Sequence, residues 1–141
     1  MAASWQFWAL LAAIFAALTA IFAKLGVDEI DADFATFLRV LVIASVLGAI
    51  LWGFDKFEPL SNLSRRGLIF LVLSGLATGA SWLCYFRAMK LGQASQVAPV
   101  DKLSVVFVAI IAALFLGETM SVAGWIGIAL VGVGSLLVAL A

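Results

Sequence analysis

Twenty residues decide the fold of this chain: VAPVDKLSVVFVAIIAALFL, residues 97–116. After Lys102 this stretch continues for 14 residues, 103–116, without a charge. A hydrocarbon core of roughly 30 Å needs about 20 helical residues at 1.5 Å each, and the charge-free part alone would cover only about 21 Å. A helix that crosses a membrane here must therefore carry Asp101 and Lys102 within the bilayer, or the membrane must be thinner at this place.

Four further apolar segments have the length of a membrane span. None shows the alternation of a barrel strand, and only a helix satisfies its backbone polar groups within one segment. The first segment has no basic residue before it, unlike a signal peptide, so we expect it to be retained. The sequence predicts an all-α membrane protein, one domain over residues 1–141, with five transmembrane helices at residues 5–23, 34–54, 67–89, 97–116 and 122–140.

Composition supports lipid as the solvent. Of the 141 residues, 66% are hydrophobic and 11% are charged, whereas a soluble domain carries about 25% charged residues. The 8 basic and 8 acidic residues balance, which argues against a nucleic-acid partner. With no His and one Cys, Cys84, the chain offers no disulfide, zinc site or Cys–His pair. No nucleophile with a base and no phosphate loop is present, so we expect neither an enzyme nor a cofactor.

The distribution of basic residues does not set an orientation. Five spans place the termini on opposite sides of the membrane, and the two sides carry three and five basic residues. Two interpretations remain open: a single orientation, or dual topology with antiparallel pairing of two copies. Small residues that suit close helix packing lie in the third and fifth spans. They are Gly75, Gly79, Gly124, Gly127, Val131 and Gly134.

The charges at the start of the fourth span have a functional and a structural interpretation. Ionisable groups inside a membrane are costly and mark solute pathways, so Asp101 and Lys102 are candidates for binding. Alternatively, with Pro99 at the first helical position, Asp101 lies in the first turn and is stabilised by the helix dipole, while Lys102 reaches the interface. Being adjacent, the two are expected to have different partners, with Arg39 and Arg87 as counter-ions for Asp101. Both arginines could instead reach lipid head groups.

The third span carries a stripe of hydroxyl groups beside aromatic rings. Such a face could line a solute cavity, with ring faces open to a cation. The alternative is that the hydroxyls bond back to their own helix. With Ser104, the predicted substrate-binding residues are Ser74, Thr78, Ser81, Trp82, Tyr85, Asp101, Lys102 and Ser104.

Capping residues at the helix ends are predicted as well. Asp31 and Asp33 stand where the second span begins. Gly117 suits a left-handed cap after the fourth span. Ser121 or Thr119 can cap the fifth span. Glu118, in the same turn, is expected to be a structural anchor.

The second half of the chain resembles the EamA domain of the drug/metabolite transporter superfamily. The resemblance covers residues 67–140 well, whereas the first two spans agree in length and place only. It is carried by Tyr85-Phe86-Arg87-Ala88-Met89-Lys90-Leu91-Gly92, Ala98-Pro99, Leu116-Gly117-Glu118, Ile126-Gly127 and Gly132.

The resemblance implies one five-helix repeat of the bacterial and archaeal type, in the cytoplasmic (inner) membrane. It implies a secondary transporter, an exporter of small organic metabolites by alternating access, which works as a homodimer in parallel or antiparallel arrangement. The expected partners are a second copy, membrane lipid and a small-molecule solute. The small multidrug transporters of this superfamily use a Glu in their first helix, which is absent here, and Asp101 is the one carboxylate placed to substitute for it. A subunit that stabilises or regulates a larger membrane complex, without transporting, is the alternative, and a passive channel is a third.

Overall fold

The computed structural model describes residues 4–141 as helices joined by short connections, with no strand in that range. Five candidate membrane spans are present, which confirms the predicted all-α membrane fold. The fourth span is divided into three pieces. The elements are α1 (Trp5–Glu29), α2 (Ala32–Gly53), η1 (Leu60–Asn62), α3 (Arg65–Leu91), α4 (Ala94–Asp101), α5 (Leu103–Ile111), η2 (Ala112–Leu116, a π-helix) and α6 (Val122–Leu140).

Most spans are longer than the apolar runs predicted. The first continues to Glu29, and in this extension Lys24 and Asp28, four residues apart, form an ion pair with an N–O distance of 3.1 Å on the helix surface. The third extends by two residues at each end, to Arg65–Leu91, and the fourth begins at Ala94 rather than 97. Charged and polar residues thus complete helices whose apolar parts alone defined the predicted limits.

The helix ends carry capping residues that the sequence predicts. The Asp31 carboxylate accepts hydrogen bonds from the backbone N–H groups of Asp33 and Phe34, at 3.0 and 3.1 Å, and so caps α2. Of the two candidates for capping α6, Ser121 does so by accepting from Gly124 N–H at 3.2 Å. Gly117 takes φ 67° at the end of η2, the left-handed region that glycine enters without a Cβ penalty.

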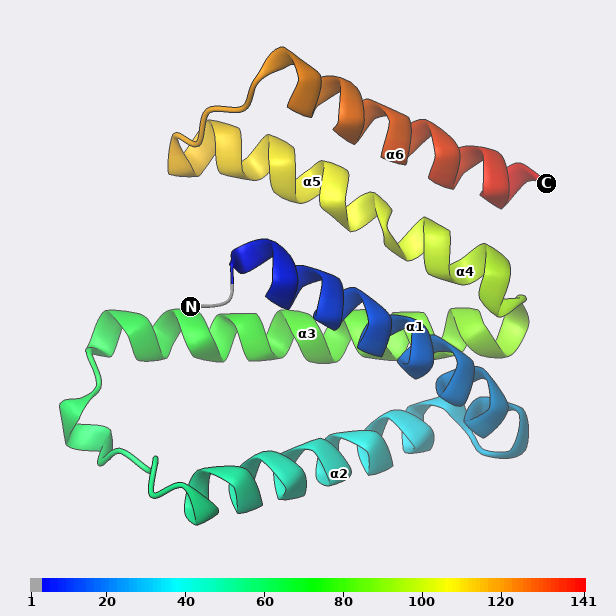
Figure 1. Cartoon of the computed structure of the whole chain (residues 1–141). Helices are drawn as coiled ribbons and strands as arrows, with labels where there is room; N and C mark the ends of the chain where they lie inside the picture. Colours follow the sequence, from blue (N-terminus) through cyan, green and yellow to red (C-terminus); the bar gives the residue numbers. More distant parts are fainter. Residues whose placement is uncertain (1–3) are drawn as a thin grey trace. The chain divides into compact units, whose positions relative to one another are not determined.

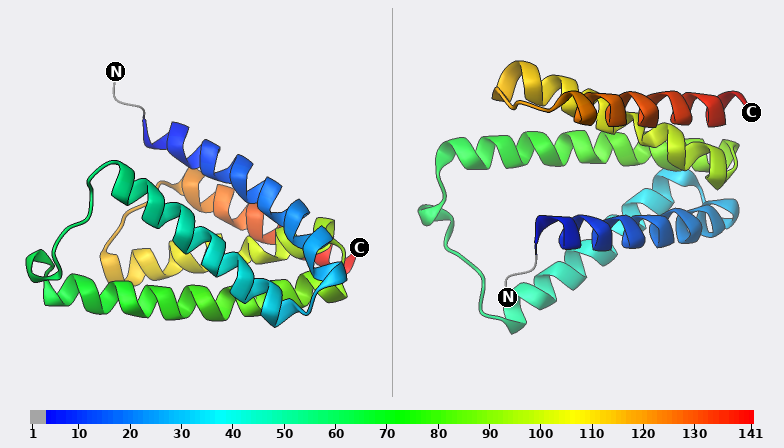
Figure 2. Two further views of the ribbon diagram at one scale, coloured as in Figure 1. Left: turned by 90° about the horizontal axis from the view of Figure 1, so that it is seen from below. Right: turned by 45° about the horizontal axis from the view of Figure 1, so that its top comes forward.

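Backbone contacts group the chain into two compact units, Ala23–Lys90 and the described residues up to Phe22 together with Leu91–Ala141. In Ala23–Lys90, α2 and α3 approach each other where α2 begins and α3 ends, and they diverge toward η1 (Figures 1 and 2). The buried side chains of this unit lie at the end where the helices meet. They are Ala23, Val27, Ala32, Thr36, Phe86 and Met89.

In the other unit, α6 lies against both α4 and α5 (Figure 1). The contact uses a different face of α6 from the small stripe predicted. A Cβ added at Gly132 would come within 3.3 Å of Val106 Cγ2, and Ser135 is buried. Gly127 and Gly134, by contrast, have no neighbouring atom within 4 Å of an added Cβ in their own unit. The predicted stripe is therefore left uncovered by α4 and α5.

Candidate functional site

Charged residues tie the helices of Ala23–Lys90 together at the end where they meet. Arg87 donates two hydrogen bonds to Asp33, with Nε–Oδ1 and Nη2–Oδ2 distances of 2.8 and 2.6 Å. Lys24 Nζ donates to the carbonyl of Met89, and Lys90 Nζ to the carbonyl of Ile30, both at 2.9 Å. Two parallel bonds between a guanidinium and a carboxylate are strong and directional, and cations suit the carbonyl end of α3. These groups join α1, α2 and α3 at one end.

The place of Arg87 corrects one prediction. The sequence predicts Arg87 as a counter-ion of Asp101 or as a residue that reaches lipid head groups. It instead pairs with Asp33, which lies in the first turn of α2. The positions of the two residues in the sequence indicate this pair: Asp33 lies near the start of one span and Arg87 near the end of the next. An antiparallel hairpin of the two spans brings them to the same end.

Arg39 lies deeper in α2 and has a different environment. It is the eighth residue of the helix, about 10 Å from its first residue along the axis. Its guanidinium carbon is 4.4 Å from the ring centroid of Trp82 and 5.4 Å from that of Phe86. Trp82 and Phe86 are four residues apart on α3 and therefore share a face. Among the described residues, Arg39 belongs to none of the ion pairs.

Contact with the two aromatic rings offsets only part of the free-energy cost of placing Arg39 in a membrane. An arginine placed toward the middle of a membrane helix costs about 2.5–3.5 kcal/mol on insertion scales. A cation over an aromatic face recovers about 0.5–2 kcal/mol. The two rings offer their faces to the cation but no oxygen atom to its hydrogen-bond donors, which lie in the plane of the guanidinium. Arg39 is held by aromatic contact but is not neutralised by it.

One hydroxyl group of the stripe on α3 bonds back to its own helix, which is the structural alternative to lining a cavity. Thr78 Oγ1 donates to the carbonyl of Ser74 at 2.9 Å, within the helix itself. Ser74, Thr78 and Ser81 are exposed, and Tyr85 is half-buried with its ring centroid 6.3 Å from that of Phe86. One face of Trp82 is taken by Arg39. Their role in binding a solute stays a prediction.

The start of the fourth span differs from the prediction. Pro99 is not the first helical residue: it lies inside α4, six residues in, and Asp101 is the last residue of that helix. Pro99 has no N–H to donate to the carbonyl of Ser95, and at Lys102 the hydrogen bonds change to the i→i−3 pattern, with Lys102 N–Pro99 O and Val105 N–Lys102 O distances of 3.0 Å. Asp101 is therefore not in the first turn of the helix that contains Pro99.

The partner of Asp101 also differs from the prediction. Its Oδ2 lies 3.3 Å from Nζ of Lys102, so the adjacent residues pair with each other. A carboxylate at the carbonyl end of α4 opposes the helix dipole, and the neighbouring ammonium offsets that repulsion. Ser104 is exposed, one residue into α5 beyond the break. The candidate span Ala94–Leu116 includes all of these residues.

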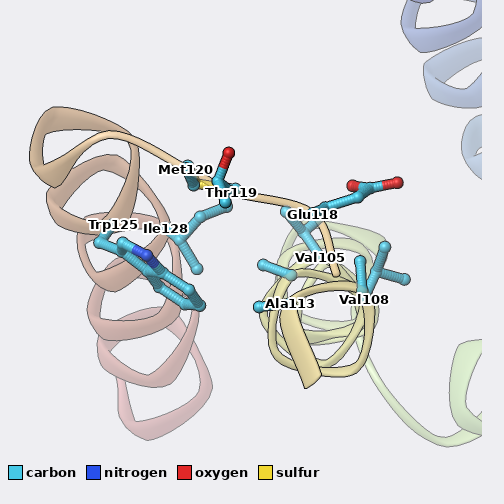
Figure 3. A pocket seen from close by; sticks show the side chains of 10 residues that line it. Val105, Val108, Ala113, Glu118, Thr119, Met120, Trp125 and Ile128 are labelled. Atoms are coloured by element: carbon cyan, nitrogen blue, oxygen red, sulfur yellow. The ribbon is translucent and has the colours of Figure 1, made fainter. Parts of the chain in front are cut away.

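A pocket of about 200 Å³ lies in the unit that contains Leu91–Ala141, at the turn between η2 and α6. Trp125, Ile128 and Met120 form one side of it, and the carboxylate of Glu118 points away from the Trp125 ring (Figure 3). Both Gly117 and Glu118 donate their backbone N–H to the carbonyl of Ala112, which closes the π-helix and fixes the turn. Glu118 thus lies in this turn through its backbone, and its role as a structural anchor stays a prediction. Within residues 4–141 no group of three or more metal-ligating side chains comes together.

Five membrane-length helices with short connections define a multi-pass membrane protein, and ionisable groups lie inside four of these spans. The chain belongs to the EamA-like transporter family, which matches residues 3–140. It is therefore a membrane transporter of the drug/metabolite superfamily. A protein of Sinorhizobium sp named "Uncharacterized transporter in cobO 3'region" is 56% identical over 139 residues, 99% of this chain and 99% of that protein. No solved structure matches the chain.

Proposed function

We propose that this chain is a secondary exporter of small organic metabolites in the cytoplasmic membrane of a prokaryotic cell, and that it works by alternating access as an antiparallel homodimer. The observation that carries the proposal is the odd number of spans, five, in a chain of a transporter family. Two copies inserted in opposite directions reproduce the inverted repeat around which many transporters alternate, with the solute at the repeat interface.

Uncovered small residues support pairing with a second copy. A Cβ added at Gly75 or Gly79 on α3, or at Gly127 or Gly134 on α6, meets no atom within 4 Å in its own unit. Small residues let membrane helices approach closely, which is the main source of helix association in lipid. Two such faces on one chain suit contact with another copy.

The interrupted fourth span supports a solute pathway. Membrane transporters place broken helices at their binding sites, where irregular backbone and charged groups line a cavity. Asp101 and Lys102 lie at such an interruption, about 12 Å into a span of about 35 Å. We propose Asp101 as a ligand for a cationic group or a coupling proton, and the hydroxyl stripe of α3 as lining of the pathway.

Tandem fusions test the antiparallel dimer directly. Because one copy has five spans, a short hydrophilic linker forces the second copy into the opposite orientation, whereas a linker containing one extra transmembrane helix forces the same orientation. Flux is measured in everted vesicles with radiolabelled amino acids, organic acids and amines. We expect the short-linker fusion to transport and the helix-linked fusion to be inactive. The reverse result would eliminate the antiparallel arrangement.

Accessibility labelling tests the orientation of the single chain. In a Cys84→Ser background, Ala141→Cys is labelled with a membrane-impermeant maleimide on intact cells and again after permeabilisation. Dual topology predicts that roughly half of the sites react on intact cells. Labelling from one side only would contradict dual topology.

The role of Asp101 is tested by flux in the variant Asp101→Asn, with Asp28→Asn as a matched control on the surface of α1. We expect transport to fall at least tenfold in Asp101→Asn, with protein level and dimer content unchanged, and to persist in the control. Full activity of Asp101→Asn would remove this residue from the mechanism. The sign of accumulation in everted and right-side-out vesicles distinguishes export from uptake.

A further inference from the structure

We propose that Arg39 is an oxyanion-binding residue and that the transported solute carries a carboxylate which the guanidinium binds. The inference rests on the proposed transport function and names its substrate class. It is drawn from Arg39, Trp82 and Phe86, which all lie in the unit Ala23–Lys90.

The first step is charge. The other cations near this end of the unit already have partners: Arg87 pairs with Asp33, Lys24 with Asp28, and Lys90 donates to a backbone carbonyl. Arg39 belongs to no ion pair among the described residues, although it lies inside a candidate span. Arginines in membrane spans face the interior of a helix bundle or a water-filled cavity, and pair with an opposite charge or with backbone carbonyls. Since the described residues provide no carboxylate within ion-pair distance, a mobile anion fits this position.

The second step is geometry. The Trp82 ring, centred 4.4 Å from the guanidinium carbon, and the Phe86 ring at 5.4 Å hold the group from α3. A guanidinium against aromatic faces loses rotational freedom, which lowers the entropy lost when a ligand binds. The N–H donors lie in the guanidinium plane, and a carboxylate accepts two of them in parallel. The Arg87–Asp33 pair shows this two-bond geometry between α2 and α3.

The third step is depth. Arg39 is six residues, or about 1.7 turns, further into α2 than Asp33. Its guanidinium contacts Trp82, which is nine residues, or about 14 Å, before the end of α3. A side chain extended toward head groups would point to the helix end, where Arg87 and Lys90 lie. The guanidinium instead lies against Trp82 and Phe86, nine and five residues before the end of α3, and its contacts at this depth favour a solute over a lipid phosphate.

Binding and flux are measured separately, so that the substrate class and the transport function are tested independently. Equilibrium dialysis in a maltoside detergent, which contains no phosphate, uses radiolabelled acetate, succinate, glutamate and phenylacetate, with the corresponding amides as uncharged matches. We expect at least one carboxylate to bind and its amide not to bind. In Arg39→Gln the affinity falls roughly ten- to a hundredfold, as for loss of a charge-assisted pair.

Further variants separate binding from folding. Arg39→Lys keeps the positive charge but loses the two parallel N–H donors of the guanidinium. We expect weaker binding that still prefers carboxylate to amide. Trp82→Leu removes the ring and lowers affinity several-fold, whereas Trp82→Phe retains most of it. The double variant Asp33→Asn/Arg87→Gln removes the neutralised pair and leaves carboxylate affinity unchanged. Size-exclusion profiles and circular dichroism confirm that each variant folds.

Each outcome decides the inference. Carboxylate binding that is lost in Arg39→Gln supports it, even if no flux is found, in which case the transport proposal fails alone. Flux of amines or neutral solutes that is unchanged in Arg39→Gln overturns the inference and leaves transport standing. Absence of binding by every carboxylate overturns it as well. Binding of phosphatidylglycerol alone, lost in Arg39→Gln, would overturn it by assigning the residue to a lipid head group.

Discussion

The contact between α5 and α6 gives the most direct test of the packing in the unit that contains Leu91–Ala141. Gly132 lies where α6 meets α5, and a Cβ there would be 3.3 Å from Val106 Cγ2. Carbon atoms prefer about 3.5–4.0 Å, so Gly132→Ala needs a shift of only a few tenths of an ångström. We expect its free energy of unfolding to change by less than about 1 kcal/mol.

Gly132→Leu is a larger perturbation at the same place. Three further carbon atoms must enter a contact that is already tight, and overpacking of this kind costs about 1–3 kcal/mol. The folding equilibrium is then expected to fall roughly five- to a hundred-and-fifty-fold. The matched control is Gly134→Leu, because an added Cβ at Gly134 meets nothing within 4 Å in its unit.

Unfolding by titration with a denaturing detergent in bicelles, followed by circular dichroism, measures both variants. Replacing the neighbour with Val106→Ala in the Gly132→Leu background makes room for part of the added side chain, and the double-mutant cycle reports the coupling. We expect a coupling energy of about 0.5–3 kcal/mol in the rescuing direction. Equal destabilisation by Gly132→Leu and Gly134→Leu, or zero coupling with Val106→Ala, would refute the α5–α6 contact.

Three further changes test the helix ends. Asp31→Ala removes the cap of α2 and lowers stability by about 1 kcal/mol, whereas Asp31→Ser retains most of it, as measured by thermal unfolding. Asp33→Ala lowers the thermal unfolding midpoint by leaving Arg87 unpaired, and the exchanged pair Asp33→Arg/Arg87→Asp restores it only in part, because each charge then opposes its helix dipole. Gly117→Val destabilises more than Gly117→Asn, since φ 67° is accessible to asparagine but strained for a β-branched residue; the same unfolding assay ranks them.

The fold was predictable from hydropathy because a membrane leaves few choices. Length and apolar character fixed the five spans, and Val122–Leu140 was predicted at its observed limits. The other limits were short because charged residues extend helices by making specific contacts. Beyond the apolar run of α1, Lys24 pairs with Asp28, and apolar runs contain no information about such pairs. Caps were predictable because they depend on residues within one turn, as at Asp31 and Ser121.

The packing faces were harder to predict because small residues occur on more than one side of a helix. In α6 the glycines at 127 and 134 suggested one stripe, yet Gly132 and the buried Ser135 mark the face in contact with α5. Lipid does not distinguish these faces by polarity, so sequence alone cannot rank them. The same ambiguity affected Pro99, which suits either the first turn of a helix or an internal break. The helix begins five residues earlier than proline alone suggests, with Gln93 as its cap.

The arginines show why candidate binding residues need a structure. Arg39 and Arg87 gave the same signal in sequence, a single cation in an apolar span, and both were assigned the same alternatives. Their partners separate them: Arg87 donates two hydrogen bonds to a carboxylate that neutralises it, while aromatic rings hold Arg39 and leave its charge in place. A neutralised cation stabilises a helix pair, and its removal should affect stability. A cation held in position without a counter-ion can take one from a solute, so its removal should affect affinity.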